Sequence, residues 1–428
     1  MSNKRGLLAL SPLMVFIALY LVTSIIANDF YKVPISVAFL ISGIFAVATL
    51  REGTLAERIE VFSRGASTSN IMLMLWIFVL AGAFASSAKA IGSIDATVNL
   101  MLNIVPDNMV LAGLFLASCF ISLSIGTSVG TTVALVPIAV GLAQATGTST
   151  AFMCGIVVGG AFFGDNLSFI SDTTIAATSS QGCKMNERFK ANFFIVLPVA
   201  VIMMAIYIVM GIQTTSPANI PGVDLLKVLP YLAVLITAIC GMNVTVVLVI
   251  GLALTGLLGI VDGQFDLYGW FGAMGEGIMS MSELIIITML AGGLFEVVRK
   301  NGGIDYIIKV STSRISGRRG AEGIIALLVA FVDMCTANNT VAIITVGGIA
   351  KHIGEKFRLN PAKVASILDT ISCCVQGVIP YGAQLLMAGG LAKLNPVDIM
   401  PFLYYPYLLF LSTVLSIIFR FPRKYATK

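Results

Sequence analysis

Apolar stretches about as long as a bilayer is thick recur along the whole 428-residue chain and constrain its fold more than any other feature. Ten of them are uninterrupted enough to form whole membrane spans. Apolar residues make up 57% of the sequence and charged residues only 11%, whereas soluble domains carry roughly a quarter. We therefore expect an all-α membrane protein. The ten stretches are 7–27, 33–50, 71–88, 151–180, 192–211, 225–241, 243–260, 278–298, 364–390 and 402–420.

Two further apolar stretches, 109–145 and 321–349, are broken midway by polar, glycine-rich sequence. If each turns back as a re-entrant hairpin instead of crossing, 22 of the 26 Lys and Arg residues face the cytoplasm. Such an asymmetry follows the positive-inside rule. We predict two hairpins in a multi-pass protein of the bacterial inner membrane, with both termini in the cytoplasm. The basic residues on the other side are Lys32, Lys89, Lys227 and Lys393.

The two halves of the chain carry the same series of elements, each with five spans and one hairpin. Because that number of spans is odd, the two halves must have opposite orientations. Inverted repeats with interrupted helices are the usual architecture of secondary transporters, whose solute site lies near the midplane. We predict a first repeat at 1–211, with hairpin 109–145 and broken helix 151–180. A periplasmic linker at 212–224 leads to the second repeat at 225–428, with hairpin 321–349 and broken helix 364–390.

The tip of the first hairpin, residues 124–132, combines five hydroxyl side chains with two glycines. Non-helical backbone at membrane depth is tolerated only where protein or a wet cavity satisfies its polar groups. Hard oxygen ligands suit Na⁺, so we assign Thr127, Ser128, Thr131 and Thr132 to ion coupling. The alternative is that these hydroxyls bond to their own helix.

Two acids, Asp165 and Asp172, lie within eight residues of each other in the first broken helix. A carboxylate near the bilayer centre costs roughly 2.5–3.5 kcal/mol on insertion scales, so each needs a bound cation or a proton. We predict that both acids bind Na⁺ and H⁺ alternately, with Ser168, Ser171 and Thr173 as neutral ligands. The alternative for Asp172 is that it caps the half-helix that restarts after the break.

The second hairpin and the second broken helix offer amide groups instead. Asn338, Asn339 and Thr340 lie at the hairpin tip, whereas Asp369 and Gln376 are seven residues apart on one helix face. Carboxamides both donate and accept hydrogen bonds, which suits a polar solute as well as an ion. We expect these five residues to complete a substrate cavity.

Several other classes of protein have no support in the sequence. The seven cysteines form no CxxC pair and the chain has one histidine, His352, so neither a zinc site nor a nucleophile–histidine enzyme is indicated. The net charge of +5 comes from short basic loops, without a nucleic-acid motif. Channel filters usually come from symmetric rings, which argues against a channel. We expect no enzyme activity and no nucleic-acid partner, with membrane lipid around the helices and no cofactor besides the coupling ions.

The run from Gly160 to Thr174 resembles the Gly-Asp-Lys-x-Ser-Pro-x-Ser-Asp-Thr-Thr signature of the NhaC family of Na⁺/H⁺ antiporters. Gly126-Thr127-Ser128 resembles its companion motif, and the resemblance covers nearly the whole chain. It implies exchange of cytoplasmic Na⁺ for protons, while relatives exchange malate for lactate or carry amino acids. It also implies ion-coupling roles for Asp165, Ser168, Ser171, Asp172 and Thr173.

The chain departs from this signature at two positions, where Asn166 replaces the usual lysine and Phe169 the usual proline. The site thereby loses a fixed positive charge and gains an aromatic ring that could wall an organic ligand. We assign both residues to the substrate cavity. We predict Na⁺/H⁺ antiport by alternating access; the alternative is a Na⁺- or H⁺-coupled carrier of a small organic anion or an amino acid. The sequence leaves the ion stoichiometry and the oligomeric state open, a homodimer included.

Overall fold

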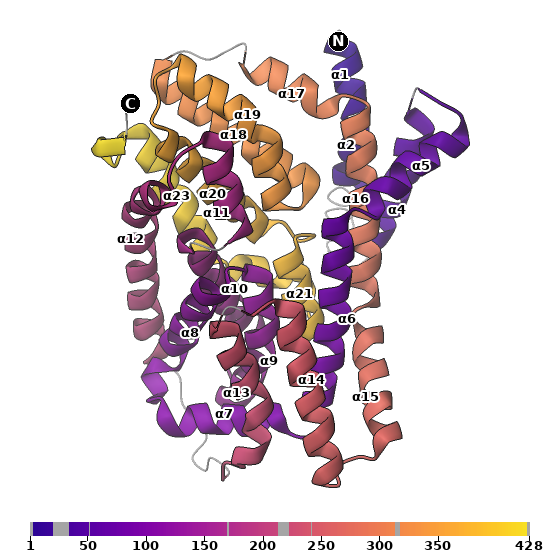
Figure 1. The fold of residues 1–428 in the computed structure, drawn as a ribbon, viewed down its shortest axis with the longest axis vertical. Helices are drawn as coiled ribbons and strands as arrows, with labels where there is room; N and C mark the ends of the chain where they lie inside the picture. Colours follow the sequence, from indigo (N-terminus) through magenta and orange to yellow (C-terminus); the bar gives the residue numbers. More distant parts are fainter. Residues whose placement is uncertain are drawn as a thin grey trace.

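The computed structural model describes residues 3–19, 34–50, 52–168, 171–212, 222–240, 242–312 and 317–425, and every regular element in these ranges is helical (Figure 1). The all-α prediction is therefore confirmed. The first half contains α1 (Asn3–Ala9), α2 (Ser11–Ile17), α4 (Ile35–Thr49), α5 (Leu55–Ala66), α6 (Ser69–Ala90), α7 (Ser93–Ile104), α8 (Val110–Ile125), α9 (Ser128–Thr146), α10 (Thr150–Leu167), α11 (Asp172–Gln181) and α12 (Met185–Gly211). The second half contains α13 (Leu225–Ile239), α14 (Val244–Val261), α15 (Leu267–Ser280), α16 (Ser282–Lys300), α17 (Gly303–Thr312), α18 (Gly317–Thr336), α19 (Asn339–Lys356), α20 (Pro361–Val378), α21 (Ala383–Ala392), α22 (Pro396–Ile399) and α23 (Tyr404–Ile418).

Seven of the described helical segments are long and apolar enough to cross a membrane, or eight if the bent pair α22–α23 counts as one span. Three further apolar helices, at Ile35–Thr49, Val110–Leu123 and Leu225–Thr237, are shorter than a full span. The chain is therefore a multi-pass membrane protein, and its described residues contain fewer full-length spans than the ten expected. The predicted span 7–27 runs beyond the described residues, and α9, which we assigned to a hairpin, is itself long enough to cross.

Both predicted hairpin tips turn by the same local device. In the first, Gly126 adopts a φ of 72° and ends α8, and the Thr127 side chain then caps α9 by accepting a hydrogen bond from a backbone amide. In the second, Ala337 adopts a φ of 49° and the Asn338 side chain caps α19 in the same way. At each tip, one residue with left-handed backbone ends the first helix, and the polar side chain of the next residue caps the second helix.

The two predicted broken helices are also interrupted within the expected ranges. Helix α10 ends at Leu167, and α11 restarts at Asp172. Helix α20 ends at Val378, and α21 restarts at Ala383. The second break contains Pro380, and the residue before a proline is disfavoured in helical conformation. Each half of the chain therefore contains a helix pair with a capped turn and a broken helix, and the inverted relation between the halves stays a prediction.

A column of helices α6, α14, α15 and α16 stands beside the bundle that contains both broken helices (Figure 1). Two of its members meet at glycines: a Cβ built on Gly82 of α6 would lie 2.3 Å from the carbonyl oxygen of Gly277 of α15. The reverse substitution is as tight, because a Cβ on Gly277 would lie 2.0 Å from the oxygen of Gly82. Small residues of this kind let membrane helices approach backbone to backbone. The column therefore forms a closely packed wall next to the bundle.

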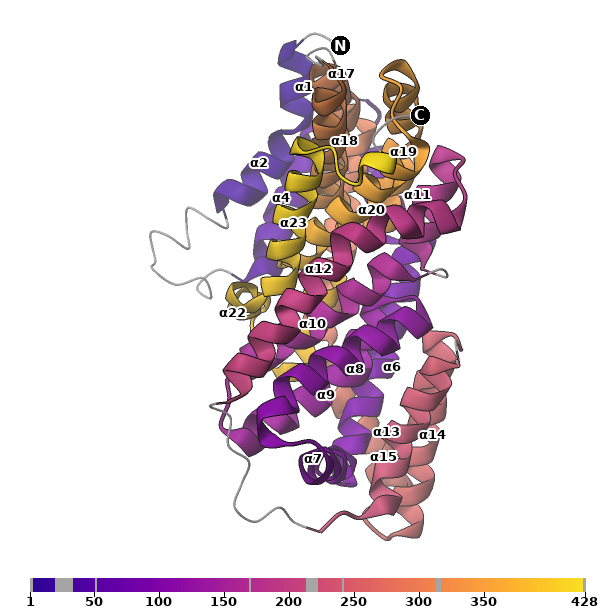
Figure 2. The same ribbon diagram turned by 90° about the vertical axis from the view of Figure 1, so that its left-hand side faces the viewer.

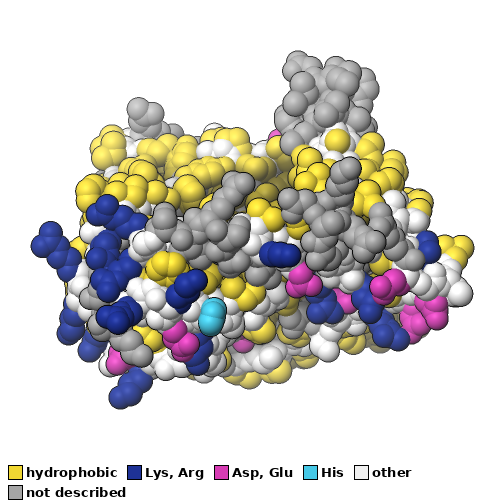
Figure 3. Space-filling view, turned by 90° about the horizontal axis from the view of Figure 1, so that it is seen from above, with side chains coloured by type: hydrophobic (Ala, Val, Ile, Leu, Met, Phe, Trp, Pro, Cys, Tyr) yellow, Lys and Arg dark blue, Asp and Glu magenta, His cyan; other side chains and the backbone are white. Residues whose placement is uncertain are grey.

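Both ends of the described chain lie at the same end of the molecule, at the top of Figures 1 and 2. Helix α7 lies across the opposite end, horizontal in Figure 1 and seen end-on in Figure 2. Figure 3 looks down on the end with the termini, where many Lys and Arg side chains gather. This clustering is the pattern that the positive-inside rule associates with the cytoplasmic side.

Candidate functional site

All four polar interruptions meet around one cavity of about 140 Å³. The two capped tips contribute residues from α9 and α19, and the two helix breaks contribute residues next to α10, α11, α20 and α21. Helix α6 of the column closes one side with apolar side chains. Ten of the residues singled out in the sequence line it: Thr127, Ser128, Asp165, Ser171, Asp172, Thr173, Asn338, Asn339, Thr340 and Gln376.

Asp165 lies on the last turn of α10 with 3% of its surface exposed, inside a cage of hydroxyl groups. Ser128, from the first hairpin tip, donates a hydrogen bond to Oδ2 at 2.8 Å. Ser171 donates to Oδ1, and Thr173 donates to the same oxygen at 3.4 Å. All three partners are neutral hydroxyl groups at the start of α9 or α11. Because none of them is charged, the cage can rearrange around a cation without breaking an ion pair.

Asp172 lies apart from this cage, although it lines the same cavity. It is exposed and occupies the first turn of α11, where a carboxylate is favoured by the positive end of the helix dipole. The residue at the N-cap is Ser171, so Asp172 does not cap the half-helix as the alternative interpretation proposed. The two acids therefore have different environments despite their seven-residue spacing.

A chain of hydrogen bonds joins Asp165 to the second hairpin tip. The amide nitrogen of Gln384 donates to Ser128 Oγ at 2.9 Å, and Ser128 in turn donates to Asp165. The side-chain nitrogen of Gln376 reaches both the Gln384 side-chain oxygen, at 3.2 Å, and the backbone carbonyl of Ala337, at 3.0 Å. Sequence reasoning missed Gln384, whose signal was a lone amide two residues after Gly382, in the first turn of α21.

Asp369 belongs to a second buried cluster outside the cavity lining. It forms an ion pair with Arg188, and both side chains have an exposed fraction of 0%. Asn192 and Asn166 donate to the same carboxylate oxygen at 2.8 and 3.2 Å. Asn166 therefore bonds to Asp369, although its neighbour Asp165 lies in the hydroxyl cage. Sequence reasoning missed Arg188 because it stands in a basic run at 184–190, which has the pattern of a cytoplasmic loop.

Three other candidates bond to nearby backbone. Thr131 donates to the carbonyl of Thr127 at 3.0 Å, and Thr132 donates to that of Ser128 at 2.9 Å. For these two the alternative of bonding to their own helix holds. Ser168 donates to the carbonyl of Leu123 at 3.2 Å. Phe169 lies outside the described residues.

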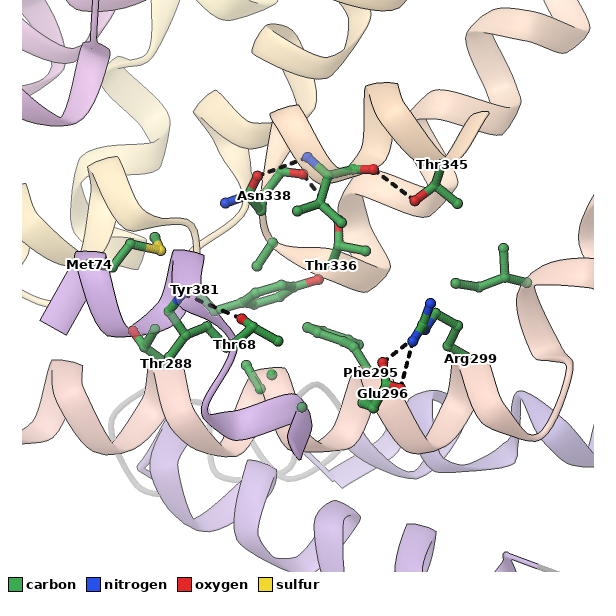
Figure 4. A pocket seen from close by; sticks show the side chains of 17 residues that line it. Thr68, Met74, Thr288, Phe295, Glu296, Arg299, Thr336, Asn338, Thr345 and Tyr381 are labelled. Carbon is green, nitrogen blue, oxygen red and sulfur yellow. Dashed lines mark hydrogen bonds and ion pairs between the residues drawn. The ribbon is translucent and has the colours of Figure 1, made fainter. Parts of the chain in front are cut away.

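A second cavity, of about 280 Å³, lies between the α18–α19 tip and helices α5, α6 and α16 (Figure 4). It shares Met74 and Asn338 with the smaller cavity. Tyr381 and Phe295 supply aromatic surface, with ring centroids 6.3 Å apart. Near one side Arg299 donates two hydrogen bonds to Glu296, at 2.7 and 2.8 Å. The larger cavity is thus mostly apolar and carries one ion pair.

The sequence is similar to those of known antiporters. The Na⁺/H⁺ antiporter NhaC of Alkalihalophilus pseudofirmus is 27% identical over 334 residues, which cover 70% of this chain and 71% of the relative. The malate-2H⁺/Na⁺-lactate antiporter of Bacillus subtilis is 21% identical over 392 residues, 83% of this chain and 82% of the relative. The match to the solved YdaH transporter of Alcanivorax borkumensis covers 92% of this chain and 99% of that transporter, at 13% identity. Its TM-score of 0.45 is too low to support a conclusion.

The profile of the Na⁺/H⁺ antiporter family matches residues 6–212 and 221–422. Both ranges are needed to form the site, because the first contains α8–α11 and the second α18–α21. The match therefore covers the four interruptions around the cavity, and it confirms the relationship that the residues from Gly160 to Thr174 indicated. The chain belongs to the Na⁺/H⁺ antiporter family.

Proposed function

We propose that this chain exchanges Na⁺ for H⁺ by alternating access, and that Asp165 is the carboxylate that holds the Na⁺. The observation that carries the proposal is the hydroxyl cage: a buried acid with three hydroxyl partners from two separate helix interruptions. Carboxylate and hydroxyl oxygens are hard ligands that suit Na⁺. No Lys or Arg among the described residues is hydrogen-bonded to Asp165, so its charge is free for a mobile cation.

Exchange follows from the free-energy cost of a buried, ionised carboxylate that holds no cation. An ionised carboxylate at membrane depth is expensive without a partner, so the protein favours states that hold either a cation or a proton. Na⁺ and protons therefore compete for the protein, which is the requirement for exchange. Asp172, exposed in the same cavity, adds negative potential that attracts the cation and is the second carboxylate of the proposed site.

The arrangement of the tips supports alternating access. Both capped tips end at the cavity, and the Ser128–Gln384–Gln376 chain ties one tip to the other. A change in what Asp165 holds thus alters hydrogen bonds that reach the second tip. A differential contact of this kind is what a bound ion needs in order to shift a conformational equilibrium.

A coupled carrier of a small organic solute is the second candidate. The observation that favours it is the 280 Å³ cavity beside the second tip, which offers aromatic surface and lies next to the amides of Asn338 and Asn339. The relative from Bacillus subtilis, named as a malate-2H⁺/Na⁺-lactate antiporter, gives a precedent for organic exchange.

Purified protein in proteoliposomes separates the two candidates. An imposed Na⁺ gradient is expected to move protons without any organic solute, as reported by a pH-sensitive dye inside the vesicles. Addition of malate, lactate, arginine or ornithine should leave that flux unchanged. Proton movement that requires one of these solutes would replace antiport with the coupled carrier, and proton movement that responds to neither Na⁺ nor any of these solutes would rule out both.

A further inference from the structure

A third buried acid, Asp333, stands on the last turn of α18, just before the second hairpin tip. Its exposed fraction is 0%, and neither carboxyl oxygen has a hydrogen-bond partner among the described residues. Cys335 and Tyr381 are the titratable side chains beside it, the Tyr381 hydroxyl donating to the carbonyl of Met334, and no salt bridge joins Asp333 to a Lys or Arg among the described residues.

An ionised carboxylate in such surroundings would be desolvated without compensation. A buried acid with no partner takes up a proton instead. Burial without a partner therefore favours the neutral carboxylic acid at Asp333. Asp333 differs from Asp165, whose hydroxyl partners stabilise a negative charge, and from Asp369, whose charge Arg188 balances.

Asp333 is connected to the Na⁺ cage through the turn that follows it. The carbonyl of Asp333 accepts a hydrogen bond from the amide of Ala337 at 2.8 Å, and the carbonyl of Ala337 accepts one from Gln376. From Gln376 the chain runs through Gln384 and Ser128 to Asp165. The hydrogen bonds of the cage around Asp165 are therefore connected to the same turn that keeps Asp333 buried.

We propose that Asp333 is the proton-binding residue of the exchange, at a site separate from the Na⁺ site of Asp165. This inference rests on the proposed Na⁺/H⁺ exchange and assigns its two ions to two carboxylates. Na⁺ binding at Asp165 shifts the α18–α19 tip, and the Asp333 carboxylic acid then releases one proton to water and becomes a carboxylate. When Na⁺ leaves, the carboxylate takes up one proton from water and is buried again.

The test measures proton release and Na⁺ binding on the same detergent-purified protein in weak buffer with an indicator dye. Wild type is expected to release protons when Na⁺ is added. Asp333→Asn, which keeps the shape of the neutral acid, should bind Na⁺ within about threefold of wild type and release no proton in response. Asp305→Asn, an exposed acid on α17, is the matched control and should behave as wild type.

Proteoliposomes supply a readout that a purely structural role would not move. Asp333→Asn should retain exchange of internal Na⁺ for external radioactive Na⁺, because that cycle needs no proton, and should lose Na⁺-driven proton flux. Asp333→Glu, which keeps a carboxyl group, should restore the flux in part. If Asp333→Asn releases protons as wild type does, or loses Na⁺ exchange together with proton flux while Asp333→Glu restores neither, the inference is overturned. Absence of Na⁺ binding by wild type would instead contradict the proposed function itself.

Discussion

Two neighbouring residues of α10 belong to two different clusters. Asp165 lies in the hydroxyl cage, and Asn166 donates to Asp369 in the arginine cluster. Both acids are buried, yet their partners differ in kind. Asp369 is neutralised by Arg188, a fixed cation, whereas Asp165 is held by neutral hydroxyls. A carboxylate whose charge is already balanced by an arginine gains little from binding a transported cation. The comparison therefore favours Asp165 over Asp369 as the exchanging acid of the proposed function.

The arginine cluster contains one of the residues at which the chain departs from the family signature. Asn166 stands where the resemblance predicts a lysine, and it donates to Asp369 beside Arg188 of α12. Orphaned polar atoms remain in the cluster, namely Oδ1 of Asn166, Oδ1 of Asp369 and two nitrogens of Arg188. Among the described residues, Oδ2 of Asp369 therefore receives all of the hydrogen bonds to this carboxylate, from Arg188, Asn192 and Asn166.

The largest effect should come from breaking the arginine cluster. Arg188→Met leaves Asp369 as an uncompensated buried charge, which is expected to lower stability by about 3–5 kcal/mol. The double variant Arg188→Met/Asp369→Leu should recover most of that loss, because replacing both members of a buried pair by apolar groups is often close to neutral. Thermal unfolding in detergent measures both variants. A double variant no more stable than Arg188→Met would contradict the assignment of the loss to an uncompensated charge on Asp369.

Removing a hydroxyl from the cage should act on Na⁺ and less on folding. Ser171→Ala deletes one hydrogen bond to the Asp165 carboxylate, a kind of bond that contributes about 1.5–3 kcal/mol. If that contribution is carried over to the bound cation, Na⁺ affinity falls by roughly 10- to 100-fold. Na⁺ titrations followed by thermal shift give the affinity. An unchanged affinity would remove Ser171 from the ion site.

The smallest effect should come from the threonine that bonds to its own helix. Thr131→Val removes a hydroxyl whose hydrogen bond goes to the carbonyl of Thr127, so Na⁺ affinity should stay within about twofold of wild type. The same titrations measure it. A loss as large as that of Ser171→Ala would return Thr131 to the ion-coupling set in which the sequence placed it.

Much of the architecture could be predicted from local sequence. Glycines and hydroxyls or amides inside apolar stretches predicted interruptions near Gly126, Asp165, Asn338 and Gln376, and these four interruptions line one cavity. Interrupted backbone cannot face lipid and must face protein or water. The local sequence pattern was therefore enough to predict that the four interruptions lie inside the protein. The functional roles assigned to these residues stay predictions.

Long-range partners could not be predicted in the same way. Arg188 and Asp369 are 181 residues apart, and the basic run around Arg188 carries the pattern of a solvated loop. Asp369 was assigned to the cavity because it shares a helix face with Gln376. A shared helix face does not determine which other helix packs against each residue. The threonines of α9 were assigned by residue type, but the bond each hydroxyl makes depends on its rotamer.

The most direct measurement compares Na⁺ binding by two purified variants in detergent. Wild type should gain about 2.7 kcal/mol of apparent stability at a Na⁺ concentration one hundredfold above Kd. Asp165→Asn is expected to lose this gain completely. Arg188→Gln/Asp369→Asn, which replaces the ion pair by neutral amides, should keep it. A Na⁺-dependent gain retained by Asp165→Asn and lost by the double variant would contradict the account, because it would place the exchanged cation at the arginine cluster.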